Sequence, residues 1–168
     1  MTRLRKLVVS AEPWQVFLVF VGVIVFNGIV KDHQETLKII AYILLSVVIF
    51  GWFLVLGTSL NDNLPEDEQK SATFYVICCC YGIFAVSSSS ILETIPIDTD
   101  FEPYAIAASI SFCLAGSYIF YFASTVYFSN QERFLDKDRL SAGATFILFI
   151  VFIVGVLVFQ SRVKKIFH

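Results

Sequence analysis

Residues 39–61 read IIAYILLSVVIFGWFLVLGTSLN and contain no charged side chain. A helix rises ~1.5 Å per residue and the hydrocarbon core of a bilayer is ~30 Å thick, so about 20 apolar residues cross it. The stretch is long enough, and Lys38 and Asp62 flank it directly. It therefore predicts a transmembrane helix.

Four more charge-free stretches accompany the first, and all charged side chains of the chain lie outside the five. These stretches are Pro13 to Val30, Ser71 to Leu92, Pro103 to Gln131 and Leu140 to Ser161. Backbone amides in lipid must be satisfied within their own segment, and the alternation typical of barrel strands is absent, so each stretch is predicted to be helical. The prediction is an all-α, polytopic transmembrane helix bundle, a single integral-membrane domain over 1–168, with five spans at about 13–30, 39–60, 71–92, 104–128 and 141–161.

The composition supports a membrane protein. Hydrophobic residues make up 57% of the chain and aromatic residues 16%, with a mean hydropathy of +0.77, which exceeds what one small soluble core can bury. In 168 residues the gaps between the stretches leave no room for a separate soluble domain. A net charge of -2 argues against a nucleic-acid partner. We expect the lipid bilayer as the main partner and a bacterial inner (plasma) membrane as the location.

The Lys and Arg residues near the span ends predict the orientation. Five spans with the N-terminus inside and the C-terminus outside give seven inner cations against five outer ones, which is a weak bias. An alternative with four spans and residues 13–30 as a re-entrant segment puts both basic ends inside and gives eight against four. The charge rule prefers this alternative, whereas the length of 13–30 favours a complete span. The weak bias also permits insertion in both orientations, as an antiparallel dimer.

No Asp, Glu, Lys, Arg or His lies in the interior of a predicted span. Proton-coupled transporters, voltage sensors and pumps generally need such groups at depth, so a charge-relay mechanism is disfavoured. His33 and His168 are the only histidines and lie outside the spans, which leaves no set of metal ligands in the membrane. The chain is therefore predicted not to be an enzyme, and no catalytic, cofactor-binding or metal residues and no cofactor are predicted.

Small and polar residues recur at helical spacing in the third and fourth stretches. Small side chains let helix backbones approach, and hydroxyls can bond across the contact, so the two faces are predicted to pack against each other as the core of the bundle. The alternative is a polar vestibule between them. If the serine hydroxyls bond to carbonyls of the preceding turn of their own helix, close helix packing explains these serines better than a vestibule does. The candidate packing or vestibule residues are Cys78, Gly82, Ala85, Ser88, Ser89, Ala105, Ser109, Cys113, Ser117 and Tyr121.

Two other clusters favour ordinary roles over a ligand site. Cys78, Cys79 and Cys80 are consecutive, so in a helix their thiols point about 100° apart and cannot share one ion. The loop from Glu93 to Glu102 carries four carboxylates but lacks the glycine turn and the ligand number of a calcium loop. We interpret it as a solvated acidic loop.

Three functional hypotheses follow. The first is a small membrane protein that acts through helix association, as a homo-oligomer or as an accessory subunit, so that its partner is a second copy or another membrane protein. The second is a pore or permeation unit for a small solute, lined by the third and fourth spans. The third is a binding protein for an apolar small molecule or lipid. A membrane enzyme ranks last because no nucleophile and base pair is present.

Overall fold

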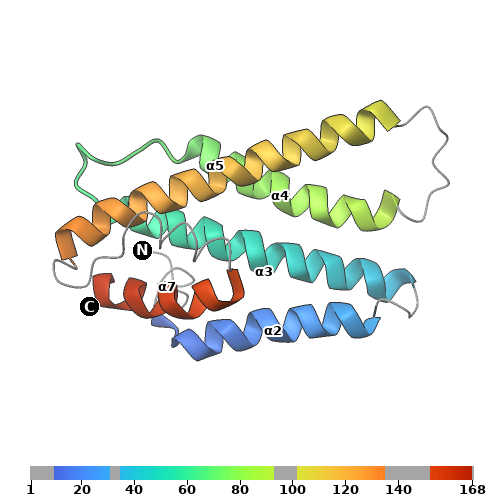
Figure 1. Cartoon of the computed structure of the whole chain (residues 1–168), viewed down its shortest axis with the longest axis horizontal. Helices are drawn as coiled ribbons and strands as arrows, with labels where there is room; N and C mark the ends of the chain where they lie inside the picture. Colours follow the sequence, from blue (N-terminus) through green and yellow to red (C-terminus); the bar gives the residue numbers. More distant parts are fainter. Residues whose placement is uncertain (1–9, 31–34, 93–101, 135–151, 168) are drawn as a thin grey trace.

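A computed structural model describes residues 10–30, 35–92, 102–134 and 152–167 of the chain (Figure 1). Within these ranges the chain forms helices and short connections, without a strand. The all-α prediction is confirmed for this part of the chain. In chain order the helices are α2 (Pro13–Val30), α3 (Glu35–Asp62), α4 (Thr73–Leu92), α5 (Glu102–Phe134) and α7 (Phe152–Phe167).

Three of these helices, α2, α3 and α5, are long and apolar enough to cross a membrane. Helix α4 is also apolar over Thr73–Ser89. Helix α7 is described over 16 residues, Phe152–Phe167. The lengths and compositions thus support a membrane location through three helices, and the prediction of five spans is not confirmed by the described residues.

The start of α2 shows why the helix begins at Pro13. Proline lacks an N–H, and the first helical position is one where no intrahelical donor is needed. The Glu12 carbonyl accepts from the Gln15 amide at 2.9 Å, and the Gln15 side-chain oxygen accepts from the Glu12 amide at 2.9 Å. This is half of a capping box, with the glutamine three residues into the turn reaching back to the cap.

The helices α2 to α5 run in alternating directions along the long axis of the molecule (Figure 1). We call the end at which α2 and α4 begin, and at which α3 and α5 end, the proximal end; it lies to the left in Figure 1. The opposite end is the distal end. Helix α3 is central because it packs against α2, α4 and α5.

The connection between α3 and α4 at the proximal end is held by side-chain amides. Asn61 donates from Nδ2 to the Lys70 carbonyl at 2.9 Å and accepts the Lys70 amide on Oδ1 at the same distance. Gln69 donates from Nε2 to the Leu64 carbonyl at 2.7 Å. A turn at Pro65, whose carbonyl accepts from the Glu68 amide at 2.9 Å, reverses the chain. The loop is therefore fixed at both ends and in its middle.

Helix α7 corrects the predicted orientation of the chain ends. Gln160 of α7 donates to the Ala11 carbonyl at 3.2 Å, and Lys164 forms an ion pair with Glu12, just before α2. The end of α7 thus lies beside the start of α2, at the proximal end, whereas five full spans would put them on opposite sides. The expected span over 141–161 is described only from 152 onward; residues 141–151 lie outside the described ranges.

The contacts of α7 with Ala11 and Glu12 agree with the four-span alternative in bringing residues 11–12 and α7 together, whereas its re-entrant segment is not seen. Residues 13–30 form the complete 18-residue helix α2, which packs along α3 and is not a re-entrant hairpin. The difference between prediction and structure lies at the other end of the chain, in α7. There, Gln160 and the charged last turns of α7 dock on the start of α2, because polar groups find partners there and none in lipid.

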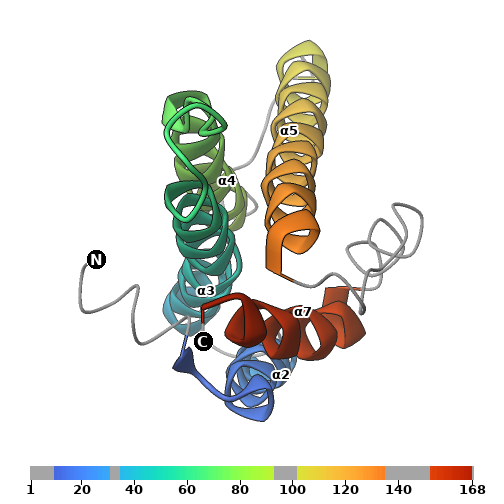
Figure 2. The same ribbon diagram turned by 90° about the vertical axis from the view of Figure 1, so that its left-hand side faces the viewer.

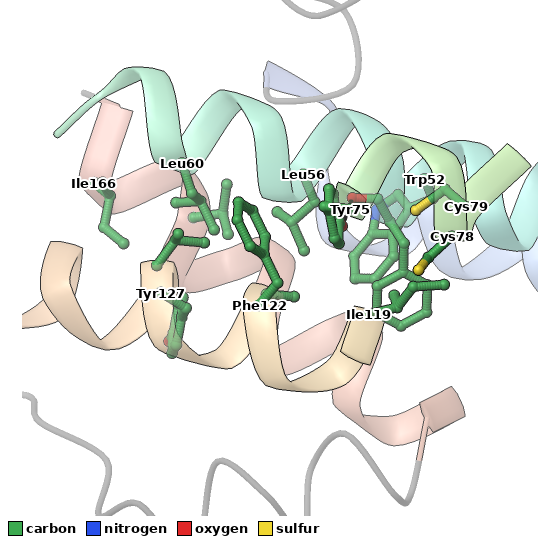
Figure 3. Close-up of a cluster of buried hydrophobic side chains, with 14 of the residues drawn as sticks. Trp52, Leu56, Leu60, Tyr75, Cys78, Cys79, Ile119, Phe122, Tyr127 and Ile166 are labelled. Atoms are coloured by element: carbon green, nitrogen blue, oxygen red, sulfur yellow. Dashed lines mark hydrogen bonds between the residues drawn. The ribbon is translucent and has the colours of Figure 1, made fainter. Parts of the chain in front are cut away.

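The core runs between α3, α4 and α5 and reaches α7 at the proximal end (Figure 3). Aromatic rings supply much of it: Tyr75 stacks on Phe122 with ring centroids 4.4 Å apart, and Trp52 meets Phe20 of α2 edge to face at 5.8 Å. The central buried residues labelled in Figure 3 are Trp52, Leu56, Leu60, Tyr75, Cys78, Cys79, Ile119, Phe122, Tyr127 and Ile166. This core is densest in the proximal half of the molecule.

Candidate functional site

The small residues of α4 pack against α3. Gly82 of α4 is buried, and a Cβ added there would overlap the Phe50 ring of α3. The relation is reciprocal, because a Cβ added at Gly57 of α3 would overlap the Tyr75 phenol of α4. Tyr75 also donates a hydrogen bond to the Phe53 carbonyl. Each helix therefore offers a glycine to an aromatic ring of the other, and the two backbones approach closely.

Hydroxyl groups extend this contact between α3 and α4. Ser46 is fully buried, and its Oγ lies 3.0 Å from the Ser87 Oγ across the helix pair. Ser88 and Ser89 donate instead to the carbonyls of Ala85 and Val86, in their own helix, at 3.1 and 2.8 Å. Of the candidates on α4, Cys78 and Gly82 are buried, Ala85 and Ser88 are half-buried, and Ser89 is exposed.

The candidate residues of α5 form a continuous exposed face. Ala105, Ser109, Cys113, Ser117 and Tyr121 recur every four residues, and all five are exposed. We call these five residues the α5 stripe. Among the three helices of membrane-crossing length, α5 has the smallest buried share of its apolar window, 11% against 33% for α3. Within the described residues, the stripe is therefore an exposed face on the least buried of these three helices.

Hydrogen bonds within the helix satisfy the hydroxyls of the α5 stripe. Ser109 donates to the Ala105 carbonyl at 2.9 Å, and Ser117 donates to the Cys113 carbonyl at 2.8 Å. Such bonds to the preceding turn leave the oxygen lone pairs available and keep the side chain compact against the helix. At the proximal end of the stripe, Lys70 Nζ lies 5.9 Å from the centroid of the Tyr121 ring, within cation–π range.

The predicted pairing of the α4 and α5 faces is therefore wrong within one chain. Helix α5 meets its neighbours through a different side, built from larger residues that include Ile119, Phe122 and Val126, all buried. The small face of α4 is occupied by α3, whose Phe50 fits over Gly82. The physical reason is shape: the bulky side of α5 fills the space beside Tyr75, so its small side faces outward.

The serines predicted to line a vestibule do not meet either. Ser88 is half-buried and Ser89 exposed on α4, and Ser109 and Ser117 lie on the exposed stripe of α5. The four cysteines are free thiols; Cys78 and Cys79 are buried, whereas Cys80 and Cys113 are exposed. The described ranges hold no group of three or more metal-ligating side chains. The acidic loop 93–101 lies outside these ranges.

A buried polar cluster at the proximal end was not predicted. Asn130 of α5 is fully buried and donates from Nδ2 to the Leu60 carbonyl at 2.9 Å, while its Oδ1 accepts from Asn63 at 2.9 Å. The Tyr127 hydroxyl lies beside Gln131 of α5 and Arg162 of α7. The six buried members of the cluster are Ser59, Asn61, Tyr127, Asn130, Gln131 and Gln160. The sequence did contain a signal for this cluster, because amide side chains recur within a few residues of three span ends.

The buried polar cluster and the α5 stripe have different chemistry. The polar cluster consists of uncharged amides and hydroxyls: Asn130 joins α5 to the end of α3, and Gln160 joins α7 to Ala11, just before α2, which is typical of a structural network. The α5 stripe is an exposed row of small side chains on an apolar helix, which is typical of a surface that receives another helix. No protein-family model, curated protein or solved structure matches this chain.

Proposed function

We propose that this chain is a small integral membrane protein that acts through helix association, with the α5 stripe as the contact surface. Its partner is a second copy of the chain, as in a homo-oligomer, or a helix of a larger membrane complex. The observation that carries the proposal is the exposure of the stripe, within the described residues, on the least buried of the three helices of membrane-crossing length.

The composition of this half of α5 supports a helix partner over lipid alone. Between Tyr104 and Ser111 every residue is exposed, and five of these eight are Ala or Ser. Small side chains gain little from contact with lipid tails, whereas they allow a second backbone to come close and form many contacts. A facing helix would therefore stabilise this segment more than lipid does.

The polar groups of the stripe suit the same purpose. The Ser109 and Ser117 hydroxyls each donate within their own helix, so each oxygen can still accept a bond from a facing helix. Interhelical hydrogen bonds of this kind contribute about 0.6 kcal/mol on average in a membrane. Shape and close packing thus supply most of the expected affinity, and the hydroxyls fix the register.

Ser109→Leu and Ser117→Leu are expected to disrupt assembly while the monomer stays folded. A leucine at either position would hold the two backbones apart, whereas both sites are exposed among the described residues, so the core of the monomer is expected to keep its packing. Migration of the purified protein in mild detergent, by size exclusion with light scattering, would show a loss of the larger species.

Ser111→Leu is the matched control. Ser111 is exposed, lies on α5 and donates to its own helix, to the Ala107 carbonyl at 2.8 Å, just as the two stripe serines do. Two residues along a helix of 3.6 residues per turn, it faces away from Ser109. The same size of oligomer in all three variants and the wild type would refute the proposal.

A further inference from the structure

The side-chain amide of Gln131 stands apart within the buried polar cluster. Gln131 is 1% exposed, and neither its Oε1 nor its Nε2 makes a hydrogen bond to a described residue. Asn130, the residue before it, is also fully buried, but its amide donates to the carbonyls of Leu60 and Val126 and accepts from Asn63. Of two neighbouring buried amides, the protein thus satisfies one and leaves the other.

A buried amide of this kind needs a partner. In folded proteins the large majority of buried side-chain polar atoms are hydrogen-bonded, either to protein or to ordered water. A glutamine amide presents two N–H donors and one carbonyl acceptor. The partner of Gln131 therefore has to be a small group that both donates and accepts.

The Gln131 amide lies near the junction of α5 and α7. The Tyr127 hydroxyl, one turn earlier on α5, lies beside both Gln131 and Arg162 of α7. Tyr127 is fully buried, and Arg162 is half-buried. In Figure 2 the bundle is viewed from its proximal side, and α7 lies across the end of α5. Polar groups from both helices thus gather where α7 crosses α5.

The relation between Gln131 and Tyr127 points to a bridging molecule. Their polar groups are neighbours, yet neither atom of the amide bonds directly to the hydroxyl. Water commonly bridges polar groups in this arrangement, because it both donates and accepts and makes about three hydrogen bonds when buried. Glu132, the next residue, is exposed and charged, so water reaches this position without crossing the bundle.

We propose that the Gln131 amide binds an ordered water molecule at the junction of α5 and α7 and shares it with the Tyr127 hydroxyl. The contact between these two helices then has a hydrated part beside the apolar packing of Val163 and Ile166. One residue earlier, the contact of α5 with α3 is direct, through Asn130 and the Leu60 carbonyl.

Nuclear magnetic resonance of the full-length protein in detergent micelles tests the water site. The side chains of Asn and Gln are labelled with ¹⁵N, and transfer from water to their amide protons is followed in NOE and ROE experiments, which separate bound water from chemical exchange. The Gln131 amide is expected to show an NOE to water. Its signal is identified by its loss in Gln131→Leu, and Gln131→Met serves the same purpose.

Asn130 is the internal control, because it is the same kind of group at the same depth and is satisfied by the protein. Its signal is identified by its loss in Asn130→Ala, and no NOE to water is expected there. A spectrum without a water NOE at Gln131 would overturn the proposal. Equal NOEs at both amides would overturn it as well, because general access of solvent would then explain them.

Discussion

Gly57→Ala is expected to lower the free energy of unfolding by about 1–3 kcal/mol, the usual cost of overpacking a core. The added Cβ overlaps the Tyr75 phenol. That ring has no room to retreat, because Tyr75 is fully buried, stacks on Phe122 and donates to the Phe53 carbonyl. Unfolding of the purified protein by sodium dodecyl sulfate, followed by circular dichroism, measures the loss.

Gly51→Ala is the matched control for this change. Gly51 lies on the same helix, α3, and a Cβ added there has no atom within 4 Å. Since alanine is the better helix former by up to about 1 kcal/mol, this variant is expected to be as stable as the wild type or more stable. Equal destabilisation by both alanines would show that α3 and α4 do not pack through Gly57 and Tyr75.

Asn130→Ala is expected to cost about 1–3 kcal/mol, the penalty for leaving a buried polar group unsatisfied. Helix α3 ends at Asp62, so the Leu60 carbonyl is one of the last four that have no partner within the helix. Asn130 donates to this carbonyl at 2.9 Å and accepts from Asn63 in the loop. The same unfolding measurement applies, and proteolysis in the loop 63–72 should become faster.

Ser129→Ala separates the network from a general effect on α5. Ser129 is the neighbouring residue, and its hydroxyl donates only within its own helix, to the Thr125 carbonyl at 3.2 Å. Its removal is expected to change stability by less than about 0.5 kcal/mol, as is usual away from such networks. If Ser129→Ala lowers the free energy of unfolding as much as Asn130→Ala does, the hydrogen bonds of Asn130 are not what stabilises the proximal end.

The helices were predictable from the sequence because a lipid environment requires each apolar segment to be helical. Charge-free stretches in lipid must close their hydrogen bonds within a helix, and α2 covers the expected residues 13–30. Helix α3 extends further, from Glu35 to Asp62, because charged residues at both ends can continue the helix outside the apolar section. The lengths thus follow from local chemistry.

The packing of α4 could not be predicted in the same way. The small residues of α4 and α5 were recognisable, but the partner of Gly82 is set by the position of Phe50 on α3, 32 residues earlier in the chain. Spacing along one helix shows which residues share a face and says nothing of which ring fills the space above a glycine. Three-dimensional complementarity therefore decided that α4 packs on α3 and that the α5 stripe faces outward.

The predicted position of the C-terminal end differed from the structure for a related reason. The count of cations depends on where each segment ends, and the predicted span 141–161 carried Arg162, Lys164 and Lys165 to the distal side. Contacts of Gln160 with Ala11 and of Lys164 with Glu12 reverse that assignment. Neither contact is visible in the sequence, because the partners are about 150 residues apart.

Oxidative cross-linking through Cys113 tests most directly whether the α5 stripe receives another helix. Cys113 is an exposed thiol in the middle of the stripe, and a disulfide forms only when two Cβ atoms come within about 4.5 Å. Membranes that contain the protein are treated with copper phenanthroline and analysed on a non-reducing gel. The control is Cys80, an exposed thiol on α4 and outside the stripe.

The account predicts a cross-linked dimer that is lost in Cys113→Ser and retained in Cys80→Ser. The absence of any adduct that depends on Cys113, or a dimer that persists in Cys113→Ser, would contradict it.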